Sequence, residues 1–132
     1  MIFVDTNVFM YAVGREHPLR KPAQEFFEHA SGVGARTRSR LCTSAEVLQE
    51  LLHVYIPVRR MQTLDAAFRL VDGAIDDVWP VEPDDVRLAH TLVDARPGLG
   101  ARDLLHVACC TRRGVTRIKT YDRALGAVMP AE

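Results

Sequence analysis

The chain has 132 residues, and its 17 Lys and Arg residues balance its 17 Asp and Glu residues, so the formal net charge is zero. A balanced charge gives no overall electrostatic attraction to nucleic acid or to an anionic membrane. A chain of this length suits one domain, residues 1–132, which can bury a substantial core. No apolar stretch approaches the roughly 18 residues of a membrane span, and an early acid, Asp5, is unlike a signal peptide. We therefore expect no membrane association.

The number and placement of the cysteines indicate the redox environment in which the protein works. Cys42, Cys109 and Cys110 are an odd number in a chain without a predicted signal peptide, which favours a reducing cytoplasm. Cys109 and Cys110 are adjacent in a predicted helix, so they point in different directions. We interpret them as small buried residues rather than as metal ligands or a redox pair.

Apolar runs and turn residues predict strands that alternate with helices. Strands are expected at residues 1–5, 40–43, 78–81 and 117–120, the third at a sheet edge because it contains Pro80. Helices are expected at residues 6–13, 18–30, 44–55, 63–74, 84–94 and 103–113. This alternation is typical of the α/β class, with a central parallel sheet flanked by helices.

Two acids follow predicted strands. Asp5 ends the apolar run of residues 1–4, and Asp122 follows the run of residues 118–121. In open α/β sheets ligands bind just beyond the carboxyl ends of the strands. If both strands are central and adjacent, Asp5 and Asp122 become neighbours. Each acid also has an ordinary alternative role, Asp5 as a helix N-cap and Asp122 as a turn residue.

Two further acids lie on predicted helices. Asp103 opens the helix of residues 103–113, where a carboxylate also interacts favourably with the helix dipole. In the helix of residues 44–55, Glu50 lies at the margin of the apolar face and Glu46 lies further toward solvent. That apolar face comprises Val47, Leu48, Leu51, Leu52, Val54 and Tyr55. Glu50 is therefore the better candidate for a pocket wall, although both glutamates could be solvated.

A cluster of carboxylates requires a cation. Two unit charges about 4 Å apart repel by roughly 4 kcal/mol at an effective dielectric near 20. A divalent ion removes this repulsion, and a set of oxygen-only ligands favours Mg²⁺ or Mn²⁺.

Four segments in this order resemble the motifs of the PIN-domain family. They are residues 4–8 (VDTNV), 44–51 (SAEVLQEL), 100–108 (GARDLLHVA) and 119–122 (KTYD). The resemblance spans the whole chain, and the length and the opening are most similar to the VapC ribonuclease toxins of VapBC toxin–antitoxin pairs. It implies a single PIN-like domain and a metal-dependent endoribonuclease that hydrolyses phosphodiester bonds.

The resemblance also implies site residues. The four catalytic acids map to Asp5, Glu50, Asp103 and Asp122, with Glu46 as the fallback for Glu50. We expect Asp5 with Asp103 or Asp122 to hold the principal Mg²⁺ or Mn²⁺, and Glu50 to hold a second ion or to orient or deprotonate the attacking water. Supporting polar groups map to Thr6, Asn7 and Thr120. The implied partners are an RNA substrate and a cognate antitoxin, with a homodimer or a toxin–antitoxin hetero-oligomer as the assembly.

Rival hypotheses remain at this point. A metal-independent ribonuclease would use paired histidines, and His53 and His106 each lie one helical turn from a candidate acid. A phosphotransferase would need a second aspartate where Asn7 stands, which disfavours that chemistry. A PIN-like module that only binds a protein, or a PIN nuclease of RNA processing that is not a toxin, would share the same fold.

Two surfaces are candidates for contacts with partners. Phosphate contacts could come from Arg36, Arg38, Arg40, Arg112, Arg113 and Arg117, although most are expected to be solvated. An apolar groove for an antitoxin could comprise Val54, Tyr55, Ile56 and Met61, and at least half of these are expected to be core residues.

Overall fold

The computed structural model describes residues 1–32 and 39–129. In that part of the chain, four strands form one sheet in the order β3-β2-β1-β4, and every strand pair is parallel. The strands are β1 (Ile2–Val4), β2 (Leu41–Ser44), β3 (Asp77–Trp79) and β4 (Arg117–Lys119). The predicted α/β class with a parallel sheet is confirmed. Strand β3 lies at a sheet edge, as predicted, and it ends at Trp79, directly before Pro80.

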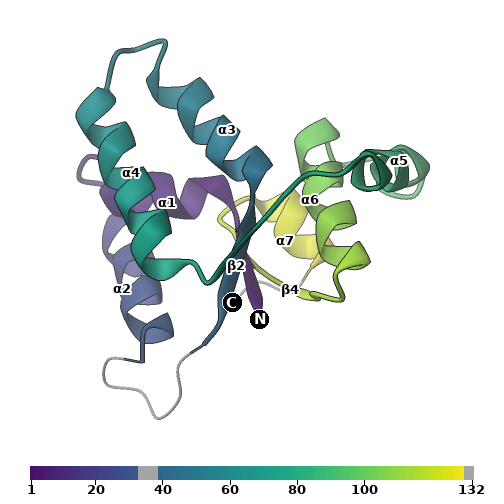
Figure 1. The fold of residues 1–132 in the computed structure, drawn as a ribbon, viewed down its shortest axis with the longest axis horizontal. Helices are drawn as coiled ribbons and strands as arrows, with labels where there is room; N and C mark the ends of the chain where they lie inside the picture. Colours follow the sequence, from purple (N-terminus) through teal and green to yellow (C-terminus); the bar gives the residue numbers. More distant parts are fainter. Residues whose placement is uncertain (33–38, 130–132) are drawn as a thin grey trace.

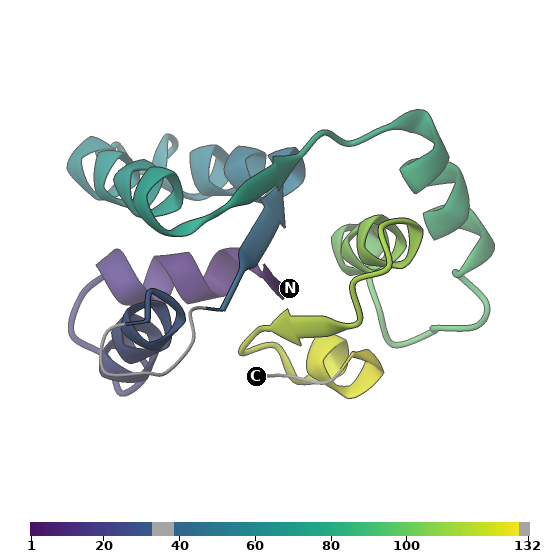
Figure 2. The ribbon, with the colours of Figure 1, turned by 60° about the horizontal axis from the view of Figure 1, so that its bottom comes forward.

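Helices cover both sides of the sheet. They are α1 (Thr6–Val13), α2 (Arg20–Ala30), α3 (Ala45–Tyr55), α4 (Met61–Ala74), α5 (Pro83–Thr91), α6 (Ala101–Arg112) and α7 (Arg123–Val128). Helices α1 to α4 lie on one side and α5 to α7 on the other (Figures 1 and 2). Connections between parallel strands are right-handed, so the direction of each crossover decides on which side its helices lie. The chain moves in one direction from β1 to β3 and in the opposite direction from β3 to β4, which places α5 and α6 on the other side of the sheet. None of the helices in the described ranges is long and apolar enough to cross a membrane.

The topology creates one reversal point, between β1 and β4. The chain winds outward from β1 through β2 to β3 and then adds β4 on the other side of β1. Phe3 pairs with Ile118 and Val4 with Lys119, so the two strands end at the same level. Ligands of open α/β sheets bind at such a reversal, outside the carboxyl ends of the strands.

The helix boundaries differ from the prediction by a few residues. Helix α5 ends at Thr91 instead of near Asp94, and α6 begins at Ala101, two residues before Asp103. Helix α7 was not predicted at all. It has only 6 residues and contains Gly126, so no periodic apolar pattern marks it. The predicted apolar face of α3 is also too broad, because Leu52 is 37% exposed.

The core surrounds β1. All three residues of β1 are buried, because β1 has a strand on each side and helices above and below. The three cysteines are buried as well. Burial raises the pKa of the Cys42 thiol to about 12 and that of Cys109 to about 11. Burial of Cys109 and Cys110 confirms their interpretation as small buried residues, and raised thiol pKa values make such cysteines unreactive.

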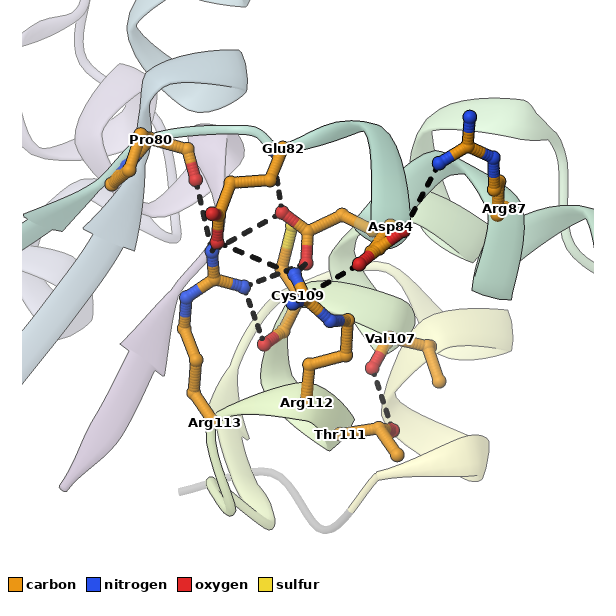
Figure 3. A network of polar contacts seen from close by, with 10 residues as sticks. Pro80, Glu82, Asp84, Arg87, Val107, Cys109, Thr111, Arg112 and Arg113 are labelled. Carbon is orange, nitrogen blue, oxygen red and sulfur yellow. Dashed lines mark hydrogen bonds and ion pairs between the residues drawn. The ribbon is translucent and has the colours of Figure 1, made fainter.

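A network of charged side chains joins α5 to the end of α6 (Figure 3). The Asp85 side chain is completely buried and accepts hydrogen bonds from Arg112 and Arg113, both at 2.8 Å. Asp85 also accepts from the Glu82 backbone N–H at 2.8 Å and so completes a capping box at the start of α5. Arg113 additionally lies over the Trp79 ring, 5.0 Å from its centre. The network fixes α5 against α6 and against the sheet edge at β3.

Candidate active site

Asp5 lies directly after β1 and begins α1. Its Oδ1 accepts a hydrogen bond from the backbone N–H of Thr6 at 2.7 Å, and its Oδ2 accepts from the Thr120 hydroxyl at 2.8 Å. Thr120 follows β4, so this bond joins the ends of the two central strands. Only 6% of Asp5 is exposed. The helix-cap role and the pocket role therefore coexist in one side chain.

Asn7 and Thr120 form a small polar network beside Asp5. Asn7 donates through Nδ2 to the Thr120 hydroxyl at 3.4 Å and accepts through Oδ1 from the Tyr121 backbone N–H at 3.2 Å. The Thr120 hydroxyl also accepts from the backbone N–H of Asp122 at 3.0 Å. These bonds hold the segment after β4 against the first turn of α1. They orient two acids, Asp5 and Asp122, toward the same space.

Glu50 comes from the middle of α3 and contacts His106 of α6. His106 Nε2 lies 3.0 Å from Glu50 Oε1 and 3.5 Å from Asp5 Oδ1. Because both neighbours are carboxylates, Nε2 must carry a proton and donate it. The His106 side chain is fully buried, and its Nδ1 has no hydrogen-bond partner among the described residues. Its polar contacts are thus directed at the two acids.

Asp103 and Asp122 complete the acidic group. Asp103 lies in the first turn of α6 and is half-buried. Asp122 is exposed and caps α7, where its Oδ1 accepts from the Leu125 backbone N–H at 3.0 Å. All four predicted acids line one open cavity of about 510 Å³. Glu46, the fallback acid, is not among the residues that line it.

The charges in this cavity shift the pKa values of its acids. Burial raises the pKa of Asp5, although His106, Thr120 and Thr6 oppose the change. Burial also raises the pKa of Asp103, and repulsion by Asp122, Asp5 and Glu50 adds to it.

The pKa values of Glu50 and His106 shift in opposite directions. Burial alone would raise the pKa of Glu50, but the hydrogen bond and charge of His106 hold it below its ordinary value. Burial opposes protonation of His106, yet its hydrogen bond to Glu50 and the nearby acids raise its pKa. Glu50 is therefore ionised at neutral pH and held in place by a buried donor.

The chemistry of the cavity suits a hard divalent cation. Its charged donors are carboxylate oxygens, and two of the acids have raised pKa values, the result of burial and repulsion that a cation would offset. In residues 1–32 and 39–129, no three His, Cys, Asp or Glu side chains converge closely enough to hold one ion together. Mg²⁺ usually binds through one or two carboxylates and keeps several waters. Asp5 with Asp103 or Asp122 is compatible with that mode.

Other residues singled out in the sequence fall elsewhere. Of the two histidines, only His106 reaches the acids, and His53 is exposed. Arg112 and Arg113 bind Asp85, and Arg40 pairs with Asp77 at 3.4 Å. Arg36 and Arg38 lie outside the described residues.

Arg102 lines the cavity, although it was not among the predicted site residues. Its guanidinium lies 4.0 Å from Glu50 Oε2. It directly precedes Asp103 in the segment of residues 100–108, and this position is the sequence signal that could have found it.

Comparison with known proteins identifies the family. The model of the PIN domain matches residues 2–128. The chain belongs to the PIN-domain family. Among its PIN-domain relatives, ribonuclease VapC23 of Mycobacterium tuberculosis is 62% identical over 127 residues, 96% of this chain and 97% of the relative.

Several solved structures share the fold. The crystal structure of VapC20 from Mycobacterium tuberculosis, described as a sarcin–ricin loop cleaving toxin, matches with a TM-score of 0.76 and 17% identity over 96% of this chain and 94% of that one. VapBC2 from Rickettsia felis, solved with a DNA fragment from its promoter, matches with a TM-score of 0.68 and 14% identity over 98% and 94%. At these identities the likeness concerns the fold alone.

Proposed function

We propose that this PIN-domain protein is a VapC-type endoribonuclease, the toxin of a toxin–antitoxin pair, and that it cuts RNA with Mg²⁺ or Mn²⁺. The observation that carries the proposal is the meeting of Asp5, Glu50, Asp103 and Asp122 around one cavity at the sheet reversal. The 62% identity with ribonuclease VapC23 supports the same activity. Residues 1–132 would form one nuclease domain acting in the cytoplasm, where its RNA is.

Asp5 is the central ligand in this proposal. Its position is fixed by Thr6, by Thr120 and by the end of β1, so its carboxylate is preorganised before any ion arrives. Asp103 and Asp122 approach from two other elements, and one of them would hold the ion together with Asp5 while waters complete its coordination. PIN-domain VapC ribonucleases are generally metal-dependent, which supports this assignment. Bound there, a divalent ion would supply an activated water and offset negative charge at the phosphorus.

Glu50 has a different role in the proposal. Its lowered pKa keeps it ionised, and the His106 donor fixes one of its oxygens. The other oxygen is available to orient the attacking water or to accept its proton. Arg102, 4.0 Å from Oε2, adds positive charge at the mouth of the cavity, where a phosphate would enter.

An antitoxin is the proposed protein partner. VapBC2 of Rickettsia felis and a Klebsiella pneumoniae structure with a TM-score of 0.67 are toxin–antitoxin proteins of the same fold, which supports a partner of this kind. Ile56 and Met61 are 49% and 47% exposed near the loop between α3 and α4, whereas Tyr55 is a core residue. The apolar docking surface would therefore centre on Ile56 and Met61. A homodimer is proposed as well.

Cleavage by the purified protein tests the activity. Total RNA would be incubated with the wild type, with Asp5→Asn and with Asp65→Asn, each with Mg²⁺, with Mn²⁺ and with EDTA. Asp65 is an exposed acid on α4, so its variant is the matched control. We expect metal-dependent fragments from the wild type and the control, and none from Asp5→Asn. Cutting that survives both EDTA and Asp5→Asn would contradict the proposal.

A further inference from the structure

A second cavity adjoins the acidic one. It has a volume of about 720 Å³ and lies between the end of α1, the segment after it and the loop between α3 and α4. Asn7, Met10 and Val54 line both cavities, so the two form one continuous groove. We call the second part the flanking groove. None of the four proposed catalytic acids lines it.

The charge of the flanking groove is opposite to that of the acidic cavity. The acidic cavity contains four carboxylates and one arginine, Arg102. The flanking groove contains Arg15, Arg60 and His17 against a single acid, Glu16. Among the described residues Arg15 makes no ion pair, in contrast to Arg112 and Arg113, which bind Asp85. Arg60 donates one hydrogen bond to the Thr63 hydroxyl at 3.2 Å and makes no ion pair with a described residue. Positive charge for an anionic ligand is thus available beside the acidic cavity.

The flanking groove also presents aromatic rings. The rings of Tyr11 and His17 lie 4.7 Å apart and are inclined by 34°, and Tyr121 meets Tyr11 edge-on at 5.5 Å. His17 Nδ1 accepts a hydrogen bond from the Leu19 backbone N–H at 3.0 Å. The proton of a neutral His17 is therefore on Nε2, which becomes a donor. Aromatic side chains in a positively charged groove are the combination on which single-stranded nucleic acid binds, because its bases stack on the rings while cations contact its phosphates.

We propose that the flanking groove binds single-stranded RNA next to the scissile phosphate, with Arg15 and Arg60 on phosphates and the Tyr11–His17 pair stacked against a base. The proposal rests on the ribonuclease function proposed above and adds where its substrate is held. It follows from the continuity of the two cavities and from the opposite charge of the second. A strand whose reacting phosphate sits among four acids needs attractive contacts elsewhere, and this groove supplies them. Because stacking accepts any base, the groove would grip RNA without selecting sequence.

Binding without cleavage tests the proposal. A short fluorescent single-stranded RNA would be titrated in EDTA, with anisotropy as the readout and a gel to confirm that the RNA stays intact. The variants are Arg15→Glu, Arg60→Glu, their combination and Tyr11→Leu. Arg87→Glu is the control, because Arg87 is 76% exposed on α5, across the sheet. Thermal melts would confirm that each variant is folded.

The arginines and the aromatic rings predict different changes in affinity and in salt dependence. The double charge reversal should weaken binding about 10-fold or more. It should also reduce the slope of log K against log salt by about 1.4, because each phosphate that an arginine neutralises on a single strand accounts for about 0.7 of that slope. Tyr11→Leu should weaken binding about 5-fold or more with an unchanged slope, because stacking is uncharged. Arg87→Glu should bind as the wild type does.

Three results would overturn the proposal. They are no binding by the wild type, wild-type affinity in the groove variants, and equal losses in the Arg87→Glu control. Wild-type affinity in the groove variants would show that the groove does not bind RNA and would favour a protein partner there. Equal losses of affinity in Arg87→Glu and in the groove variants would show that RNA is attracted by the overall charge of the protein. Because no metal and no cutting are involved, failure here is distinguishable from failure of the nuclease activity. If the protein binds RNA through the flanking groove but never cuts RNA, the proposed nuclease activity is wrong and the proposed RNA-binding groove still stands.

Discussion

Single side chains near Asp5 decide what the site can do. Glu46 and Glu50 belong to the same helix and the same motif, yet only Glu50 lines the acidic cavity. The difference comes from their position on α3, because Glu50 lies at the edge of the buried face formed by Val47, Leu51 and Tyr55. The two glutamates therefore form a natural pair for comparison.

Neutralising these glutamates one at a time separates their roles. We predict that Glu50→Gln slows RNA cleavage by about 100-fold or more, the range for loss of a catalytic acid or base. Glu46→Gln should cleave at the wild-type rate. Initial rates under the same metal concentration measure both. Equal losses in the two variants would show that net charge on α3, rather than a specific carboxylate, is what matters.

His106 makes stability depend on pH. Its pKa is raised in the folded protein above 6.5, because Glu50, Asp5 and Asp103 favour its charged form. A raised histidine pKa stabilises the fold fully below the unfolded value, and this contribution is lost as pH rises through the folded value. We predict that the stability advantage of the wild type over His106→Gln shrinks as pH rises from 6 to above neutral. The decrease should be about 1.4 kcal/mol for every pH unit that separates the folded pKa from the unfolded one.

Urea unfolding at several pH values measures this difference. His106→Gln is the suitable variant, because glutamine keeps a donor for Glu50 without a titrating ring. The exposed histidine of α3, His53, gives the control His53→Gln, whose curve should run parallel to that of the wild type. An advantage that grows with pH would contradict the assigned contacts of His106.

At the scale of elements, the junction between α5 and α6 depends on one buried carboxylate. Asp85 has no exposed surface and is held by Arg112, Arg113 and the Glu82 backbone. Burial would raise its pKa, but these donors hold the pKa far below the ordinary value. The ionised Asp85 carboxylate therefore stabilises the folded protein fully above its unfolded pKa, near 3.8. This stabilisation is lost as pH falls below that value. Its neighbour Asp84 is 67% exposed on the same turn.

Replacing these two aspartates tests the junction. Asp85→Ala removes the partner of two partly buried arginines and opens the capping box, so we predict a loss of about 3 kcal/mol in the free energy of unfolding. Asp84→Ala should cost less than about 1 kcal/mol, because its ion pairs are solvated. Chemical denaturation at neutral pH compares them. Similar small losses of unfolding free energy in both variants would show that the contacts of Asp85 with Arg112 and Arg113 add little to stability.

At the scale of the whole molecule, the sequence predicts the architecture better than it predicts the site. The alternation of strand-like and helix-like segments is enough to predict a parallel sheet with flanking helices. The acids Asp5 and Asp122, which follow two strands, correctly indicate that β1 and β4 are neighbours. The short helix α7 escaped prediction, because Gly126 and a length of 6 residues leave no pattern. The contacts of His106 with Glu50 and Asp5 also lie beyond local patterns. They join α6, α3 and β1, and only tertiary packing brings these elements together.

We propose that this fold gathers carboxylates at an electrostatic cost, which a bound divalent cation would offset. Thermal melts of the wild type and Asp103→Asn, each with EDTA and with excess Mg²⁺, test it without knowledge of the RNA target. In EDTA, Asp103→Asn should melt a few degrees above the wild type, because it relieves repulsion by Asp122, Asp5 and Glu50. Partial exposure of Asp103 keeps this gain to about 1 kcal/mol or less, about 4 °C in a domain of this size. Mg²⁺ at about 100 times its Kd adds about 2.7 kcal/mol to the stability of the wild type, so it should raise the melting temperature by about 10 °C. It should leave the melting temperature of Asp103→Asn nearly unchanged. A wild type that is indifferent to Mg²⁺, or equal shifts in both proteins, would contradict the claim.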